Sequence, residues 1–293
     1  MEPSSIGRAV QLLGDRWTLL IVRDAFLHRR RRFAQWRDAL GVPDSVLAGR
    51  LQDLVDGGVF ERVRYEESPP RDEYRLTEAG LELWRILIAV WAWEKRWVER
   101  PELPALVHLD CGAQTLPFLA CGACGEEVLA RDVVPQVQPG GGLYLTAPPR
   151  FRRRSSKESE PTDPQLLYPE TMAIVGDRWS GVVMARAFMG VRRFVDFEAT
   201  TEASPTVLSD RLRKLVSLGV LSRGEASEYR LTDKGLAFFP VLALLMDWAD
   251  RWGPQGPHVM HLVHRPCGKE LVPALRCDSC AGVLERRRVQ FAL

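Results

Sequence analysis

Six cysteines and two of the five histidines fall into two arrays with one spacing, His-x2-Cys-x9-Cys-x2-Cys. Three thiolates and one imidazole are a ligand set typical of closed, tetrahedral structural zinc sites. The amino-terminus lacks a basic-then-apolar signal, and no apolar run approaches the roughly 18 residues of a membrane span. The chain is therefore expected in the cytoplasm, where reducing conditions favour metal binding over disulfides. We predict one zinc ion in each array, the ligands being His108, Cys111, Cys121 and Cys124 in the first and His264, Cys267, Cys277 and Cys280 in the second.

The spacing of the cysteine pairs indicates what would hold such a site. The nine residues between the pairs suit two short strands, and the apolar stretches 116–119 and 271–275 fit that role. This is a zinc-ribbon pattern. Two alternatives remain open, namely reduced thiols in a metal-free ribbon and a redox-active pair. A catalytic zinc is disfavoured because four protein ligands leave no open coordination position.

The two arrays end two copies of a longer repeated segment. Gly-Asp-Arg-Trp occurs at 14–17 and 176–179, followed by Arg-Arg-Phe, Val-Leu-x-x-Arg-Leu and Tyr-Arg-Leu-Thr in the same order. The offset between copies falls from 162 to 155 before the last of these motifs, so the second copy has lost residues in one loop. At 293 residues the chain is long enough for about two domains. We predict two tandem domains of one kind.

Each copy contains the pattern of a helix-turn-helix with a wing. In the first copy, helical spacing predicts helices at 33–40 and 44–56, joined by the turn Gly41-Val42-Pro43. Alternating residues then predict strands at 59–65 and 72–76, joined by a loop, 66–71, too long for a tight turn. In such motifs the amino-terminal residues of the second helix enter the major groove of DNA.

The net charge of +2 does not by itself indicate a nucleic-acid partner, so that prediction rests on local groups. A run of four arginines, 29–32, precedes the first helix of the motif, although a solvated charged face is the alternative explanation. The first copy is expected to dominate DNA affinity, because the second has a shorter wing and acidic neighbours at 196, 198 and 202. The predicted DNA contacts are Arg30, Arg31, Arg32, Ser45, Arg50, Arg62, Arg64 and Arg71, with Arg192, Arg193, Thr206, Ser209 and Arg211 in the second copy.

A long apolar helix follows each predicted wing, from Thr77 to about Glu99 and from Thr232 to Trp252. Both are apolar on more than the one face that a surface helix needs. We predict that they pair, making either a pseudo-dimer within one chain or a homodimer. The alternative is that each is a deep core helix of its own domain.

In these ordered motifs the chain resembles the HxlR family of winged helix-turn-helix regulators, over residues 6–97 and 168–252. The resemblance implies a dimeric regulator that binds double-stranded DNA and often represses. Two departures concern the first recognition helix. Pro43 stands where the family usually has a capping serine, which the second copy keeps as Ser204, and Gly49 lies inside the helix. A cysteine often found near the family's amino-terminus is absent.

The predicted fold is mainly α with small β-hairpins, an α+β class. The expected units are winged domains at 1–100 and 168–254, zinc-ribbon-like modules at 101–134 and 255–293, and a linker at 135–167. The predicted function is a DNA-binding transcriptional regulator that binds operator DNA through its recognition helices and wings, and the resemblance implies a repressor. The alternative is a protein-interaction module without sequence-specific DNA binding. No nucleophile set, phosphate loop or catalytic carboxylate pair indicates an enzyme, and no membrane partner is expected.

Overall fold

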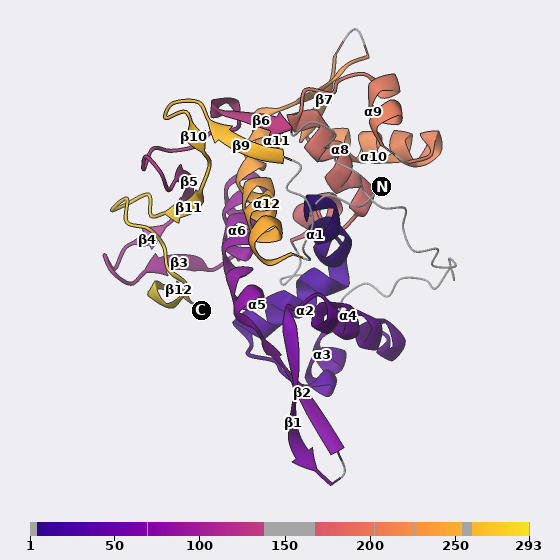
Figure 1. Cartoon of the computed structure of the whole chain (residues 1–293), viewed down its shortest axis with the longest axis vertical. Coiled ribbons are helices and arrows are strands. Elements are labelled where there is room, and N and C mark those ends of the chain that lie inside the picture. Colours follow the sequence, from indigo (N-terminus) through magenta and orange to yellow (C-terminus); the bar gives the residue numbers. More distant parts are fainter. Residues whose placement is uncertain are drawn as a thin grey trace.

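The computed structural model describes residues 5–68, 70–137, 168–201, 203–224, 227–253 and 260–292. Two winged helix-turn-helix modules lie at opposite ends of the long axis, and two long helices cross the middle (Figure 1). Small antiparallel strands from both halves lie along one side. The expected α+β class is confirmed. Within the described ranges, no helix is long and apolar enough to cross a membrane.

The first module has the predicted helix-turn-helix boundaries. Leu47, Leu51 and Leu54 are fully buried on one face of the recognition helix, as its helical spacing requires. Gly41 ends the preceding helix in the left-handed conformation, with a φ of 62° that glycine adopts without strain. The elements are α1 (Ser5–Leu13), α2 (Arg16–Leu27), α3 (Phe33–Leu40), α4 (Asp44–Asp56), β1 (Phe60–Glu67), β2 (Pro70–Leu76), α5 (Glu78–Glu82) and α6 (Trp84–Trp97).

Two predictions for this module differ from the structure. The wing strands run further than expected, because Glu66 pairs with Arg71 and Glu67 with Pro70, so strand pairing covers much of the predicted loop 66–71. Residue 69 itself lies outside the described residues. The single long helix is divided into α5 and α6 at Leu83. A Cβ added to Gly80 of α5 would lie 2.1 Å from the Val59 carbonyl oxygen, so this short helix sits directly against the backbone before β1.

The second module repeats this plan with a shorter wing. Ser204 caps its recognition helix, its Oγ accepting the Val207 N–H at 3.4 Å, whereas Pro43 provides no side-chain cap in the first module. The predicted difference between the two caps is confirmed. The elements are α7 (Pro169–Ile174), α8 (Arg178–Phe188), α9 (Phe194–Thr200), α10 (Pro205–Ser217), β7 (Leu221–Arg223), β8 (Tyr229–Leu231), α11 (Asp233–Leu236) and α12 (Phe239–Trp252).

The long helices α6 and α12 pack against each other within the chain. The Trp248 indole donates to the Ala79 carbonyl at 2.8 Å, and the Trp93 indole donates to the Lys234 carbonyl at 3.0 Å. Trp93 also meets Phe238 edge-on, with ring centroids 5.1 Å apart. Buried side chains of both halves form one continuous cluster, which explains why these helices are apolar on two sides. The predicted pairing of the two helices is therefore found within a single polypeptide.

The cysteine-bearing segments do not form two separate ribbons. β3 pairs with β12, β5 with β11, and β6 with β9, so each of these three pairings joins a strand of one half to a strand of the other. β6 also extends three residues into the predicted linker, whose remaining residues, 138–167, lie outside the described residues. The elements are β3 (Ala105–His108), β4 (Gln114–Thr115), β5 (Phe118–Cys121), β6 (Val133–Val137), β9 (Met260–His264), β10 (Lys269–Glu270), β11 (Pro273–Arg276) and β12 (Val289–Ala292), with short 3-10 turns at Ala130–Asp132 and Arg286–Arg288.

Candidate metal centres and nucleic-acid surface

Four tight turns present the eight potential metal ligands. Each turn begins with a histidine or cysteine whose carbonyl accepts the N–H of the residue four positions later, at 2.7–2.9 Å. That fourth residue has a positive φ in every turn, and it is glycine in three of them and Ala281 in the fourth. Glycine is favoured at such positions because it lacks a Cβ. We name these turns by their ligand pairs: His108/Cys111, Cys121/Cys124, His264/Cys267 and Cys277/Cys280.

The turns combine across the two arrays rather than within them. One group contains His108, Cys111, Cys277 and Cys280, and the other contains Cys121, Cys124, His264 and Cys267. The prediction that each array closes its own site is therefore wrong in its grouping, although all eight residues are used. The physical reason lies in the strands. After Cys111 the chain runs through β4 into β5, which pairs with β11 of the other half instead of folding back.

Both groups have the dimensions of a zinc site. In each, the potential ligand atoms lie within 4.8 Å of one another. The His108 Nδ1 lies 3.4 Å from the Cys111 Sγ and 3.3 Å from the Cys280 Sγ, and the Cys111 and Cys277 sulfurs are 3.9 Å apart. Zinc–ligand bonds of about 2.0–2.3 Å in a tetrahedron require ligand separations of about 3.5–3.8 Å. The second group agrees, with 3.4 Å from the His264 Nδ1 to the sulfurs of both Cys124 and Cys267.

The surroundings of the first group suit an anionic ligand set. Burial raises the pKa of the Cys277 thiol, but hydrogen bonds from Thr115 and backbone amides outweigh it and lower the pKa to about 6. The His108 Nε2 lies 3.2 Å from an Asp110 carboxylate oxygen, an arrangement that orients a metal-bound imidazole. The Thr115 hydroxyl oxygen also lies 2.8 Å from an Asp278 carboxylate oxygen. In the second group the His264 Nε2 is buried without a partner in the described structure.

The Gly-Asp-Arg-Trp repeat has a structural role that the sequence did not reveal. Asp15 caps α2, accepting the N–H of Trp17 at 3.0 Å, and the same carboxylate binds the Arg50 guanidinium at 2.9 and 3.0 Å. Asp177 and Arg211 repeat this pair in the second module, at 2.9 and 2.7 Å. The two aspartates also form an isolated antiparallel bridge with each other. The signal was present in the sequence, because an aspartate and an arginine recur together in both copies.

Arg50 and Arg211 were predicted to contact DNA, but each guanidinium is directed at its aspartate. We expect Arg50→Ala to lower the free energy of unfolding by about 1–2 kcal/mol, because a half-buried, two-bond ion pair is lost and Asp15 keeps its charge. Chemical denaturation measures this. A double-mutant cycle with Asp15→Asn should show that the two effects are not additive. Additive effects would contradict an energetic link between the residues, and Arg211→Ala with Asp177→Asn provides the matched test.

The arginines of the run before α3 have different surroundings, because one forms an internal ion pair and others are exposed. Arg30 forms an ion pair with Asp24, which is fully buried and also binds Arg23 at 2.6 Å. Arg31 and Arg32 are exposed, and their backbone N–H groups both donate to the Gln35 side chain at 2.9 Å. The run is thereby held at the amino-terminus of α3, with the Arg31 and Arg32 side chains available to phosphate.

The wing of the first module lies directly beside this run. The Tyr74 N–H of β2 donates to the Arg31 carbonyl at 2.7 Å, and the Arg32 guanidinium lies 4.3 Å from the Tyr65 ring centroid. Arg62, on β1, donates to Gln52 of α4 at 3.2 Å. The arginine run, the recognition helix and the wing therefore form one continuous surface.

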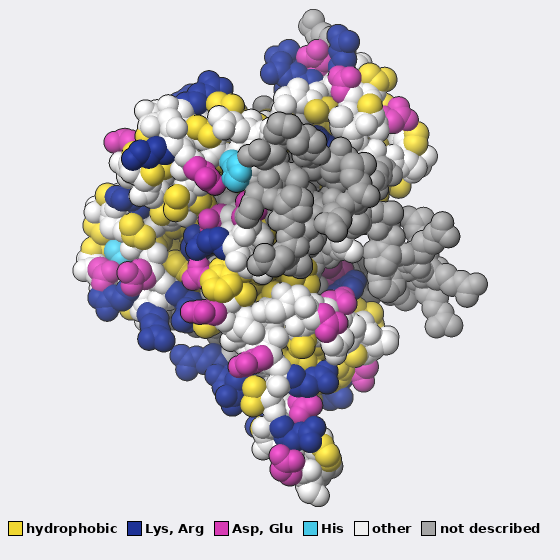
Figure 2. Space-filling model, in the orientation of Figure 1, with side chains coloured by type: hydrophobic (Ala, Val, Ile, Leu, Met, Phe, Trp, Pro, Cys, Tyr) yellow, Lys and Arg dark blue, Asp and Glu magenta, His cyan; other side chains and the backbone are white. Residues whose placement is uncertain are grey.

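The exposed wing carries carboxylates as well as arginines. Arg64 lies 3.2 Å from Asp72 and 3.8 Å from Glu67, and Arg71 lies 3.4 Å from Glu66. Figure 2 shows the two signs of charge mixed along this lower end of the molecule. Exposed pairs of this kind stabilise a fold by only about 0–1 kcal/mol, so phosphates can replace the carboxylates as partners.

The second module has a corresponding surface, on which fewer of the described positively charged side chains are without a carboxylate partner. Tyr229 N–H donates to the Arg192 carbonyl at 2.7 Å, repeating the contact of the first wing with its arginine run. Arg193 lies 4.0 Å from Glu228. Thr206 is exposed near the start of α10, and the Ser209 hydroxyl accepts from Arg213 at 3.4 Å. Ser45 is correspondingly exposed near the start of α4.

The chain is similar to known proteins of helix-turn-helix type. The model of the HxlR-like helix-turn-helix family matches residues 12–102 and 174–257. An uncharacterised HTH-type transcriptional regulator of Mycobacterium tuberculosis, Rv3095, is 47% identical over 141 residues, which cover 47% of this chain and 89% of the relative. One of Synechocystis, sll1512, is 38% identical over 32% of this chain and 70% of the relative. Among solved structures, a Pseudomonas aeruginosa protein described as a transcription factor, PA1374, is 32% identical, with a TM-score of 0.33, over 42% of this chain and 84% of that chain.

Proposed function

Because this chain belongs to the HxlR-like helix-turn-helix family, we propose that it is a DNA-binding transcriptional regulator that represses by occupying operator DNA. The observation that best supports this proposal is the pairing of two winged modules on one shared core. Dimeric regulators of this type present two recognition helices to successive half-sites. Here a single polypeptide presents both α4 and α10, on the same side of the view in Figure 1.

The two modules are proposed to contribute unequally. The first offers Arg31, Arg32 and the longer wing to the phosphate backbone, with Ser45 near the start of α4 facing the groove. The second offers Arg192, Arg193 and Thr206, but the exposed Asp196 and Glu198 lie on α9 beside them. Backbone contacts supply much of the affinity and make it dependent on salt. We therefore propose that the first module anchors the protein and the second completes the site.

Zinc is proposed as the occupant of both Cys3His groups. Four protein ligands at these separations close the coordination sphere, so the ion would stabilise structure rather than catalyse. His108, Cys111, Cys277 and Cys280 would hold one ion, and Cys121, Cys124, His264 and Cys267 the other. Each ion would then link the two halves of the chain.

An electrophoretic mobility shift tests the DNA-binding proposal. The zinc-loaded full chain should bind a DNA fragment from upstream of its own gene with higher affinity than an unrelated fragment of equal length. This preference should hold at several salt concentrations. A footprint should cover two half-sites about one helical turn apart, or a multiple of that spacing. If the folded protein shows no preference for any upstream fragment, the proposal fails. The protein-interaction alternative would then be favoured.

A further inference from the structure

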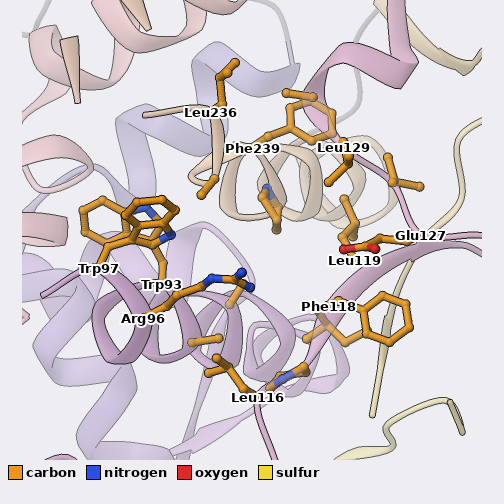
Figure 3. A pocket seen from close by; sticks show the side chains of 18 of the residues that line it. Trp93, Arg96, Trp97, Leu116, Phe118, Leu119, Glu127, Leu129, Leu236 and Phe239 are labelled. Atoms are coloured by element: carbon orange, nitrogen blue, oxygen red, sulfur yellow. The ribbon is translucent and has the colours of Figure 1, made fainter. Parts of the chain in front are cut away.

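A cavity of about 330 Å³ lies between the two long helices and the zinc-ribbon strands. Its walls come from both halves of the chain: α6, the α11–α12 corner, β5 and the segment after Cys124. Trp93, Trp97, Phe118 and Phe239 give it an aromatic lining (Figure 3). This size and lining suit a small organic ligand.

The two halves of the chain align in sequence with an offset of 155 residues along α6 and α12. The cavity can therefore be compared with the corresponding region of the other half. Ion pairs occupy the region of the other half that corresponds to the cavity through the repeat. Arg85 lies 2.8 Å from Asp247 and 3.3 Å from Glu82, and Arg251 pairs with the same two carboxylates.

At the cavity, three of these four charged residues are replaced. In the aligned repeat, Ala237 occupies the position of Glu82, Ala92 that of Asp247 and Pro240 that of Arg85. All three of these residues line the cavity. The fourth, Arg251, is kept as Arg96. Arg96 has therefore lost both carboxylates that its counterpart contacts, and within the described residues it forms no ion pair or hydrogen bond. Figure 3 shows its guanidinium directed among the lining side chains.

We propose that this cavity binds an aromatic monocarboxylate, with the carboxylate on Arg96 and the ring among the aromatic side chains. Arginine binds carboxylates with two parallel hydrogen bonds, and alanine at 92 and 237 leaves Arg96 without the carboxylates that its counterpart Arg251 contacts. The Trp97 N–H is buried without an acceptor and is a second potential donor, although its counterpart Trp252 shares this property. Glu127 and Asp233 also line the cavity, but neither pairs with Arg96. This ligand site goes beyond the proposed DNA binding and does not depend on it.

Calorimetric titration without DNA tests the site, with 2-naphthoate as the probe and its neutral amide, 2-naphthamide, as the matched comparison. The zinc-loaded chain should bind the acid roughly tenfold or more tightly than the amide, the size expected for a charge-assisted pair. Arg96→Gln should remove this preference. Arg251→Gln, at the related position, should leave it unchanged.

A second variant fills the cavity from within. Ala92→Asp restores the carboxylate that Asp247 provides in the other half, so it should pair with Arg96 and abolish naphthoate binding while circular dichroism stays unchanged. Absence of naphthoate binding at millimolar concentration, equal binding of acid and amide, or retention of the preference in Arg96→Gln would each overturn the proposal. So would preferential binding of 2-naphthylmethylamine that Glu127→Gln removes, because this outcome would assign a cation site.

Discussion

Replacing Cys111 and Cys277 together with serine should leave one zinc ion per chain, whereas replacing Cys111 and Cys121 together should leave none. The first pair belongs to one group of ligands and the second pair is divided between both groups. If each array closed its own site, the two results would be exchanged. Elemental analysis of the purified chain, which should contain about two zinc ions before substitution, measures the difference.

Stability provides a second readout for the same variants. Zinc in small structural sites supplies folding energy, so its loss should affect the strands that it holds more than the helical core. Removal of both ions by a chelator should expose β3, β5, β9 and β11 to hydrogen exchange, while α2 and α4 stay protected. Loss of protection throughout the chain would contradict this division, and a zinc content well below one ion per chain would contradict the proposed sites.

Replacing Arg62, Arg64 and Arg71 together with alanine should weaken DNA binding across all sequences and flatten its dependence on salt. The three side chains lie on one wing, beside the arginine run and the recognition helix. Each lost phosphate contact reduces the salt slope by about 0.9, so the expected change is up to about three contacts. Fluorescence anisotropy at several salt concentrations gives the slope.

The carboxylates on the same wing provide the opposite control. Glu66→Gln with Asp72→Asn neutralises the partner of Arg71 and the nearer of the two partners of Arg64, so DNA binding should become tighter. In the second module, Arg223 is the counterpart of Arg62, so Arg223→Ala should cost less affinity than Arg62→Ala. If Arg223→Ala weakens binding as much as Arg62→Ala, the proposed inequality of the two modules is wrong.

The helices of the fold were predictable from sequence because their signals are local. The spacing of Leu47, Leu51 and Leu54 and the turn at Gly41 set the limits of α3 and α4, and these were confirmed. The wing was less predictable. Its strands continue through Glu67 and up to Pro70, because pairing with the opposite strand can extend a hairpin into residues of weak strand propensity.

The grouping of the metal ligands could not be read from spacing. Two identical arrays allow each site to close within one half or between halves, and both arrangements use three cysteines and one histidine. The choice depends on whether β5 pairs with its own half or with β11, which is a contact between residues more than 150 positions apart. The role of Arg50 was missed for a related reason. Arg50 was predicted to contact DNA because it lies on the recognition helix, but Asp15, 35 residues earlier, binds the guanidinium.

If both groups bind zinc as proposed, the interlaced turns make metal loading depend on the order in which the chain is synthesised. Each Cys3His group needs two ligands from the first half and two from the residues between 264 and 280. A growing chain that has been completed only through Cys124 therefore holds two half-sites, each with two ligands, and neither can enclose an ion. Coordination becomes complete only when the last cysteine pair has been made and the second half has docked. Zinc uptake would thus act as a check that both halves are present and assembled before the regulator reaches its final form.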